Sequence, residues 1–191
     1  MAGELYTGLR IAVDDGVELR PLGLEDAELV YSIIAAERER LSEWLPWPVA
    51  IQSASDEASF IRTSLGQLAM GEGMACAIVT NRTIAGGIGL HRTDYINQRT
   101  ELGYWLAAGF VGRGLMSRST QALTTFAFEV LGLHRVVIRS ATGNARSRAI
   151  PMRLGFVHEG TQREAELLNG ELVDLEVYSM LSTEWFPSGA G

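Results

Sequence analysis

The chain has 191 residues, 47% hydrophobic and 20% charged, with a formal net charge of −7, which favours one globular domain with a full core. Nucleic-acid-binding domains are usually basic, so the acidic balance disfavours that class of partner. No apolar run approaches the roughly 20 residues of a membrane span, and we expect neither membrane attachment nor a signal peptide.

The basic residues are unevenly placed. All 16 of them are arginine, and seven lie between residues 101 and 160, beside only three glutamates. This middle third therefore suits a small polyanionic ligand, and the acidic remainder suits a cationic partner. The single cysteine, Cys76, allows no internal disulfide and predicts a reducing, cytoplasmic location. It lies in the apolar run 74–79, so we expect a buried structural thiol.

Hydrophobic periodicity and turn residues predict alternating strands and helices. The first half of the chain is predicted to form a hairpin over 9–22, a helix over 24–40, an irregular Trp/Pro loop over 42–48, a helix over 55–70 and strands at 74–79 and 83–91. A strand at 101–106, a helix over 113–131 and a strand at 135–141 follow. The last elements are a short helix that Asn144 caps and that ends before Gly155, and a strand pair at 156–166 and 171–181. The fold class is α/β (α+β), a mixed sheet with helices on its faces. We expect a single domain over residues 1–186 and a flexible tail at 187–191.

Some positions carry more detailed expectations. In the first helix, Leu24, Leu29, Ile33 and Ile34 should face inward, and the charged run 37–40 outward. The pair Gly86-Gly87 inside a strand indicates a bulge or a close approach of another backbone. Trp44 and Trp47 are either core plugs or the wall of a substrate pocket, and the pattern leaves both open.

The stretch 101–119 is the most informative. A strand runs into a turn with Gly109, Gly112 and Gly114, and an amphipathic helix follows. Helix N-termini present unpaired N–H groups and the positive end of the dipole, so residues 112–117 are interpreted as a phosphate cradle. A plain flexible helix start is the alternative. The P-loop and dinucleotide patterns both fail, since Leu115 and Met116 stand where a P-loop needs Lys and Ser/Thr.

Later motifs carry a resemblance to a known family. After the strand, turn and helix comes N-x-x-S-x-x-x-x-x-R-x-G-F, formed by Asn144, Ser147, Arg153, Gly155 and Phe156. The chain thereby resembles the GNAT superfamily of N-acetyltransferases, and more narrowly its RimJ/RimL-type branch, which acetylates ribosomal-protein N-termini. The narrower resemblance covers nearly the whole chain through Leu19-Arg20-Pro21-Leu22, the Trp44/Trp47 loop, Glu101–Leu106, Gly112–Met116 and Ala165-Glu166-x-x-Asn169-Gly170.

The resemblance implies a GNAT-like mixed, mostly antiparallel central sheet flanked by helices, with acetyl-coenzyme A as cosubstrate. It assigns the pyrophosphate to backbone N–H groups of the turn, and the pantetheine arm to the strand edge and to the residue that caps the short helix. The implied cofactor-binding residues are Trp105, Leu106, Gly112, Arg113, Gly114, Leu115, Met116, Ser117 and Asn144. Val111 departs from the polar first residue of the family's turn, which removes one side-chain contact.

The resemblance also implies catalytic roles. Many superfamily members have, where Pro151 stands, a tyrosine that protonates the leaving thiolate; the RimL-type branch assigns that role to a serine that matches Ser147. The same branch assigns the general base to a glutamate that matches Glu166. Glu101 is a second candidate base, or else the ion-pair partner of an arginine such as Arg99. No metal is expected, because the three histidines show no ligand spacing.

The predicted function is transfer of acetyl from acetyl-coenzyme A to a primary amine by direct attack. The favoured acceptor is a protein N-terminal α-amine; a small cationic amine is also compatible, with Trp44 and Trp47 as substrate-binding residues. The alternative is a catalytically silent module that senses acyl-coenzyme A, which Val111 and Pro151 favour. A third possibility, a nucleotide-binding protein, lacks the lysine and acidic metal ligands that it would need. The resemblance also leads us to expect a homodimer.

Overall fold

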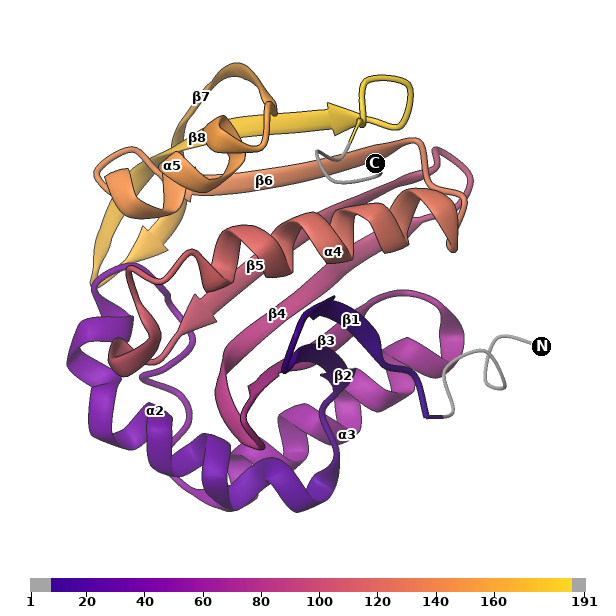
Figure 1. The fold of residues 1–191 in the computed structure, drawn as a ribbon. Coiled ribbons are helices and arrows are strands. Elements are labelled where there is room, and N and C mark those ends of the chain that lie inside the picture. The colour runs from indigo at the N-terminus through magenta and orange to yellow at the C-terminus, as the bar shows by residue number, and fades with distance from the viewer. Residues whose placement is uncertain (1–7, 187–191) are drawn as a thin grey trace.

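A computed structural model describes residues 8–186 (Figure 1), so the predicted tail at 187–191 lies outside it. The elements are β1 (Ile11–Asp14), β2 (Val17–Pro21), η1 (Leu24–Asp26), α2 (Ala27–Ser42), α3 (Ala54–Met70), β3 (Met74–Thr80), β4 (Thr83–Asp94), β5 (Arg99–Leu106), η2 (Ala108–Phe110), α4 (Leu115–Glu129), β6 (Arg135–Ala141), α5 (Ala145–Arg153), β7 (Val157–Leu168) and β8 (Glu171–Leu181). Every predicted element is present, with ends shifted by a few residues. No helix within residues 8–186 is long and apolar enough to cross a membrane.

The strands form one sheet in the order β1-β2-β3-β4-β5-β6-β8-β7. Each described pair of neighbours is antiparallel except β5 and β6, which are parallel. The mixed, mostly antiparallel sheet is therefore confirmed. In Figure 1, α4 crosses in front of the sheet, while α2 and α3 lie along its lower part.

The helices cover both faces of the sheet and divide the core into two clusters. One cluster packs Leu123 and Phe126 of α4 against the sheet, and the other packs Ile34 of α2 and Ile61 of α3. Successive side chains of β5 alternate between them, with Tyr104 and Leu106 beside the first and Trp105 beside the second. The position of a residue along β5 therefore decides whether its side chain packs toward α4 or toward α2 and α3.

The parallel strands β5 and β6 separate after a short paired stretch. They pair only at Arg99↔Arg135, Thr100↔Val136 and Glu101↔Val137, although both strands continue beyond these pairs. In Figure 1 they diverge toward the left of the view. The result is a wedge in the sheet, along which one edge of β5 has no neighbouring strand among residues 8–186.

The pairing of β5 with β4 shows which backbone groups face this wedge. The Ala107 N–H donates to the Ala85 carbonyl at 2.8 Å, and the register continues with Gly87 opposite Trp105. Since backbone groups of successive strand residues point to opposite sides, those of Trp105 point toward β4. Those of Tyr104 and Leu106 point into the wedge.

The first predicted helix differs from expectation. Residues 24–26 form a 3₁₀ turn, and the α-helix begins only at Ala27. Leu24 lies in the 3₁₀ turn and Leu29 lies off the face of α2 that buries Val30 and Ile34. They are exposed by 47% and 45%, so their predicted inward orientation is wrong. Ile34 is buried as predicted.

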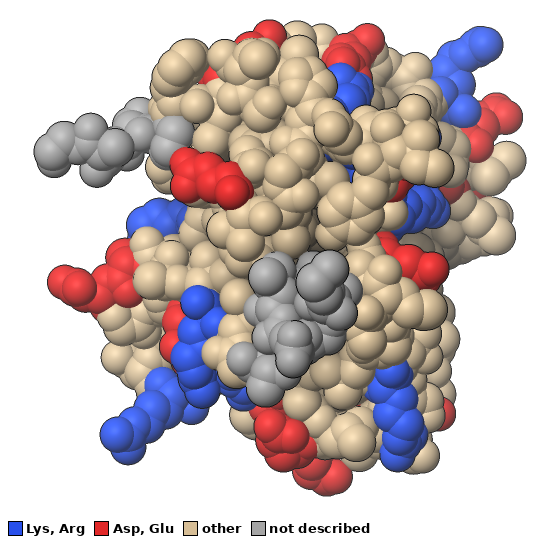
Figure 2. Space-filling view, turned by 90° about the vertical axis from the view of Figure 1, so that its right-hand side faces the viewer, with Lys and Arg blue, Asp and Glu red and all other residues tan. Residues whose placement is uncertain are grey.

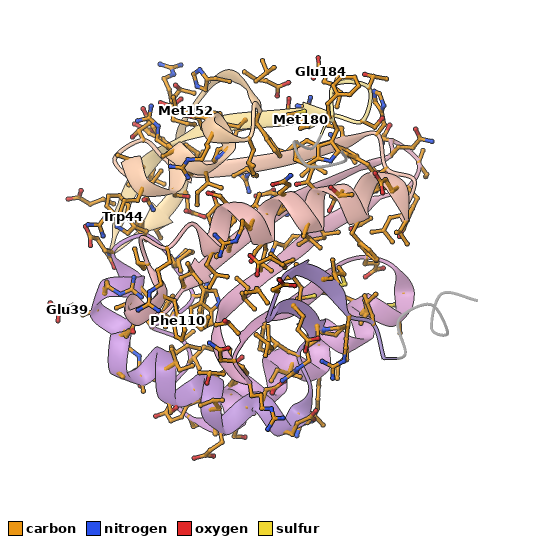
Figure 3. All side chains as sticks on the ribbon, viewed as in Figure 1. Glu39, Trp44, Phe110, Met152, Met180 and Glu184 are labelled. Atoms are coloured by element: carbon orange, nitrogen blue, oxygen red, sulfur yellow. The ribbon has the colours of Figure 1, made fainter. Side chains whose placement is uncertain are left out.

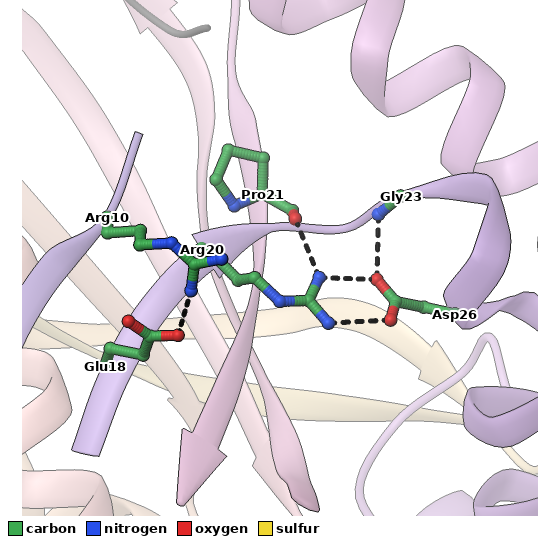
Figure 4. A network of polar contacts seen from close by, with 6 residues as sticks. All are labelled: Arg10, Glu18, Arg20, Pro21, Gly23 and Asp26. Carbon is green, nitrogen blue, oxygen red and sulfur yellow. Dashed lines mark hydrogen bonds and ion pairs between the residues drawn. The ribbon is translucent and has the colours of Figure 1, made fainter. Parts of the chain in front are cut away.

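An ion pair fixes this helix start to β2 (Figure 4). The Arg20 guanidinium donates to both carboxylate oxygens of Asp26 at 2.6 and 2.7 Å, and the Gly23 N–H donates to the same carboxylate at 2.8 Å. Burial by itself would raise the pKa of Asp26, but these hydrogen bonds outweigh it and hold the pKa below its ordinary value. The motif Leu19-Arg20-Pro21-Leu22 thus has a structural role here.

The pair Gly86-Gly87 marks both a bulge and a close approach, as predicted. The register between β3 and β4 shifts at Ile78/Val79, opposite this segment. A Cβ on Gly86 would clash with the Trp105 carbonyl oxygen, and one on Gly87 would lie 2.5 Å from the Trp105 indole nitrogen. The two glycines let β4 pass directly beneath Trp105. Cys76 is buried, as expected, and burial raises the pKa of its thiol to about 12.

Glu57 is the least expected core residue. It lies on the buried face of α3 with Ile61, Ser64 and Leu68, and it is 2% exposed. Burial raises the pKa of its carboxyl to about 7. Between pH 4.5 and 7 the unfolded chain loses this proton while the folded chain keeps it, so stability should fall as the pH rises through that window.

We therefore expect Glu57→Gln to raise the free energy of unfolding by about 1–3 kcal/mol at pH 8 and to leave it nearly unchanged at pH 4.5. Urea unfolding at the two pH values measures this, with Glu39→Gln as an exposed control. An equal effect of Glu57→Gln at both pH values would contradict the buried, protonated carboxyl.

Candidate active site

A cleft of about 1450 Å³ opens along the wedge between β5 and β6. It runs from the start of α4 past α5 to the end of α2. The cleft is lined by every candidate site residue from the sequence except Arg113: Trp44, Trp47, Glu101, Trp105, Leu106, Gly112, Gly114, Leu115, Met116, Ser117, Asn144, Ser147 and Glu166. The tertiary structure thus joins segments more than a hundred residues apart.

The glycine turn has the form of an anion site. Gly112 and Gly114 have φ values of +81° and +70°, which favour glycine, and Gly114 is the N-cap of α4. Within the described chain, the N–H groups of residues 112–117 have no protein hydrogen-bond acceptor. The side chains of Leu115 and Met116 are buried in the core, so these two residues offer only main-chain groups. The turn can therefore hold phosphate oxygens at the positive end of the helix dipole.

Several arginines of the middle third line the cleft, and two of them, Arg118 and Arg153, contact the glycine turn. Arg118, Arg139, Arg146 and Arg153 line the cleft. Arg153 donates to the Ser117 hydroxyl at 2.7 Å, whereas Arg113 lies over the Phe110 ring, 5.9 Å from its centroid. On the face to the right in Figure 1, arginine and acidic side chains are interleaved (Figure 2). The basic bias seen in the sequence is thus partly directed into the cleft.

Glu37 and Arg40, predicted to face outward, instead hold the end of β5. The backbone of α2 is kinked at Glu37, and the Ala108 N–H donates to the Glu37 carboxylate at 2.9 Å. Arg40 pairs with Glu37 and donates to the Leu106 carbonyl at 2.7 Å. The kink turns these side chains toward the sheet, which a regular helical pattern could not reveal. The Leu106 carbonyl is therefore occupied, while its N–H remains directed into the wedge.

The start of α5 carries Ser147. As predicted, Asn144 caps this helix, and its side-chain oxygen accepts the Ser147 N–H at 3.0 Å. The Ser147 hydroxyl donates to the Tyr104 hydroxyl at 3.3 Å, and Tyr104 donates to the Ser147 carbonyl at 3.1 Å. Burial raises the pKa of Tyr104 to about 12, so this phenol stays protonated at neutral pH. Pro151 is buried within the same helix.

Glu101 is engaged by two guanidinium groups. Arg139 donates to its carboxylate at 2.8 Å, and Arg92 approaches the other oxygen at 3.3 Å. Arg99, the partner suggested from the sequence, pairs with Asp94 instead. These two contacts occupy both oxygens of the Glu101 carboxylate.

Glu166 lies next to a β-bulge, a feature often found beside active sites. The register between β7 and β8 shifts between Gln162 and Glu166, and Glu164 within the bulge has a φ of +49°. The Glu164 N–H donates to the Asp174 carboxylate at 2.8 Å, which holds the bulge. Glu166 is half-buried in the cleft wall, and its carboxylate has no ion-pair or hydrogen-bond partner within residues 8–186.

The tryptophan loop packs against the core and also lines the cleft. Trp44 packs so closely on Gly143 that a Cβ there would lie 3.3 Å from its ring. Trp47 meets Trp105 edge to face, with ring centroids 6.0 Å apart. Both line the cleft, and Figure 3 places Trp44 and Phe110 at the same end of the molecule. The Asn169 side chain donates to the Ser42 carbonyl at 2.9 Å and ties the β7–β8 turn to this loop.

His91 lines the cleft without having been singled out from the sequence. Its ring lies over Gly103 and Gly89, whose hypothetical Cβ atoms would be 3.3 and 3.4 Å from it. Desolvation lowers the pKa of His91, against the raising effect of Glu101, so the ring is neutral at pH 7. The only sequence signal is the pair of nearby glycines that make room for the ring. Residues 8–186 contain no cluster of His, Cys, Asp or Glu suited to a metal ion.

The family model described as "Acetyltransferase (GNAT) domain" matches residues 17–157. The putative ribosomal N-acetyltransferase YdaF of Bacillus subtilis is 36% identical over 174 residues, covering 91% of this chain and 95% of that protein. The ribosomal-protein-serine acetyltransferase of Escherichia coli is 28% identical, covering 90% and 96%.

Among solved structures, RimL, a ribosomal L7/L12 alpha-N-protein acetyltransferase in complex with coenzyme A, has a TM-score of 0.88 at 27% identity and covers 91% of this chain and 98% of its own. The microcin C7 self-immunity acetyltransferase MccE, in complex with acetyl-CoA and AMP, has a TM-score of 0.84 at 30% identity and covers 88% and 94%. GNAT enzymes use acetyl-coenzyme A, and the cradle and wedge of this cleft fit that cosubstrate. The chain belongs to the GNAT family of N-acetyltransferases.

Proposed function

We propose that this acetyltransferase modifies the α-amine of a protein N-terminus. One observation carries the proposal. Glu166, whose carboxylate has no hydrogen-bond or ion-pair partner within residues 8–186, lines the same cleft as Ser147 and the phosphate cradle. An α-amine with a pKa of about 7.7–8.0 is roughly one-third neutral near pH 7.5, whereas a lysine amine is neutral about one time in a thousand. A single carboxylate base therefore suits the α-amine. The names of the two relatives support a ribosomal protein as acceptor, and the name of RimL, an alpha-N-protein acetyltransferase, supports an α-amine.

Different residues along the cleft bind different parts of the cosubstrate. The N–H groups of residues 112–117 hold the phosphates, and the wedge edge of β5, into which the backbone groups of Tyr104 point, receives the pantetheine arm like an added strand. Bound acetyl-coenzyme A supplies a thioester for attack. The Leu106 N–H, which points into the wedge, stabilises the oxyanion that develops.

Two side chains move protons in this proposal. The Glu166 carboxylate takes a proton from the attacking amine, directly or through water. The Ser147 hydroxyl gives a proton to the leaving sulfur. Glu101, held between Arg139 and Arg92, becomes an electrostatic element of the cleft wall and remains a second candidate base.

Calorimetric titration with acetyl-coenzyme A, followed by thiol release against amine acceptors, tests the proposal. The panel holds lysine-free hexapeptides with free N-termini, N-terminally blocked hexapeptides with one lysine, a polyamine and an amino sugar. We expect binding, with thiol release only for free α-amines.

Release with the polyamine, the amino sugar or the blocked lysine peptides alone would contradict the α-amine assignment. Binding without release from any acceptor would instead support the silent acyl-coenzyme A sensor, which Val111 and Pro151 favour. Failure to bind acetyl-coenzyme A would contradict the cradle assignment.

A further inference from the structure

Tyr104 and Ser147 form a hydroxyl pair across the cleft, from β5 to the first turn of α5. The Tyr104 side chain lies on the α4 and α5 side of the sheet, opposite to the side that Trp105 faces. Both hydroxyl residues line the cleft, and two hydrogen bonds join them, at 3.1 and 3.3 Å. The pair therefore lies in the wall of the cleft, beside the wedge, and is not enclosed between α5 and the sheet.

The serine needs such a partner. Among the α5 residues that line the cleft, Ser147 alone carries a hydroxyl. An aliphatic hydroxyl is a much weaker acid than a phenol, so a serine that gives up its proton must regain one at once. Pro151, one turn further along α5, has no proton to offer. The phenol of Tyr104, which accepts a hydrogen bond from Ser147 Oγ, is the acidic group that the structure places against this serine.

We propose that Tyr104 resupplies the proton that Ser147 delivers to the leaving thiolate, an inference that rests on the proposed role of Ser147. As the carbon–sulfur bond breaks, its electron pair stays on sulfur, and the Ser147 Oγ proton moves to sulfur. The Tyr104 proton moves to Ser147 Oγ, and water later returns a proton to the phenolate. Two hydroxyl rotations are required: that of Ser147 from Tyr104 to the sulfur, and that of Tyr104 from the Ser147 carbonyl to Ser147 Oγ.

Burial raises the pKa of Tyr104 to about 12, so the phenol holds its proton at neutral pH and has one to give. The phenolate formed in the relay is the less stable form in these surroundings, so it regains a proton from water.

The test compares Tyr104→Phe, Ser147→Ala and the double variant by thiol release with a free α-amine hexapeptide and by titration with acetyl-coenzyme A. Tyr104→Phe keeps the ring and loses only the hydroxyl. We expect kcat to fall about tenfold with the dissociation constant of acetyl-coenzyme A unchanged. The double variant should be no slower than Ser147→Ala, since Tyr104 acts through Ser147. Tyr31→Phe, which removes another hydroxyl bonded to a backbone carbonyl, is the matched control and should keep full activity.

Rates in mixtures of light and heavy water provide a readout that a purely structural role would not move. The unaltered enzyme should show a curved dependence from two protons in flight, and Tyr104→Phe a dependence closer to linear. A Tyr104→Phe variant as fast as the unaltered enzyme, or losses that add fully in the double variant, would overturn the inference. If Ser147→Ala kept full activity, the proposed role of Ser147 itself would fail, which is a different result from a fast Tyr104→Phe beside a slow Ser147→Ala.

Discussion

In the Gly114→Asp variant, acetyl-coenzyme A is expected to bind at least about 100-fold more weakly than in the unaltered enzyme. The backbone at Gly114 has a φ of +70°, which costs a residue with a side chain about 1–2 kcal/mol. The carboxylate would also enter the cradle and repel the phosphates there. Loss of about 2.8 kcal/mol of binding free energy corresponds to the 100-fold change. Calorimetric titration measures the dissociation constant.

Gly132→Asp is the matched control for this variant. Gly132 follows the other end of α4, has a φ of +66°, and is exposed away from the cleft. It carries the same backbone strain and the same added charge, so it should lower stability without changing affinity. Gly114→Ala separates strain from charge and should lie between the two. Unchanged affinity in folded Gly114→Asp would remove the cradle from cosubstrate binding.

The second large effect is expected at Glu166. In Glu166→Gln, kcat should fall about 100-fold, while the dissociation constant of acetyl-coenzyme A stays unchanged, because the amide cannot accept the amine proton. The loss should shrink as the pH rises above about 8, where the α-amine is already neutral. Thiol release from pH 6.5 to 9.5 measures both effects.

Glu164→Gln provides the control, since Glu164 lies in the same bulge with an exposed side chain that does not line the cleft. It should retain full activity at each pH. If Glu166→Gln were equally fast, Glu166 would have no part in proton transfer, and His91 or Glu101 would take its place as the base to test.

Local patterns in the sequence predicted the order of elements and most of their ends. Period-2 alternation, Asn169-Gly170 and the Asn144 cap depend on neighbours along the chain, so they could be identified without the fold. The glycine turn before α4 is equally local, because positive φ angles and a helix N-terminus involve only a few consecutive residues. The inward prediction failed at Leu24 because it lies in a 3₁₀ turn, and at Leu29 because the buried face of α2 runs through Val30 and Ile34.

The family resemblance, carried by short motifs in a fixed order, named Ser147 and Glu166 but could not place them. That both line one cleft depends on the divergence of β5 from β6 and on a bulge in β7, both set by long-range strand pairing.

The sequence by itself therefore determined the elements, the glycine turn before α4 and the family, since each depends on motifs whose residues lie close together along the chain. Only the tertiary structure decided that Glu37 and Arg40 hold the end of β5, that Arg139 and Arg92 hold Glu101, and that Tyr104 meets Ser147. Contacts between distant segments follow from how the sheet and its helices pack, and no local pattern encodes them.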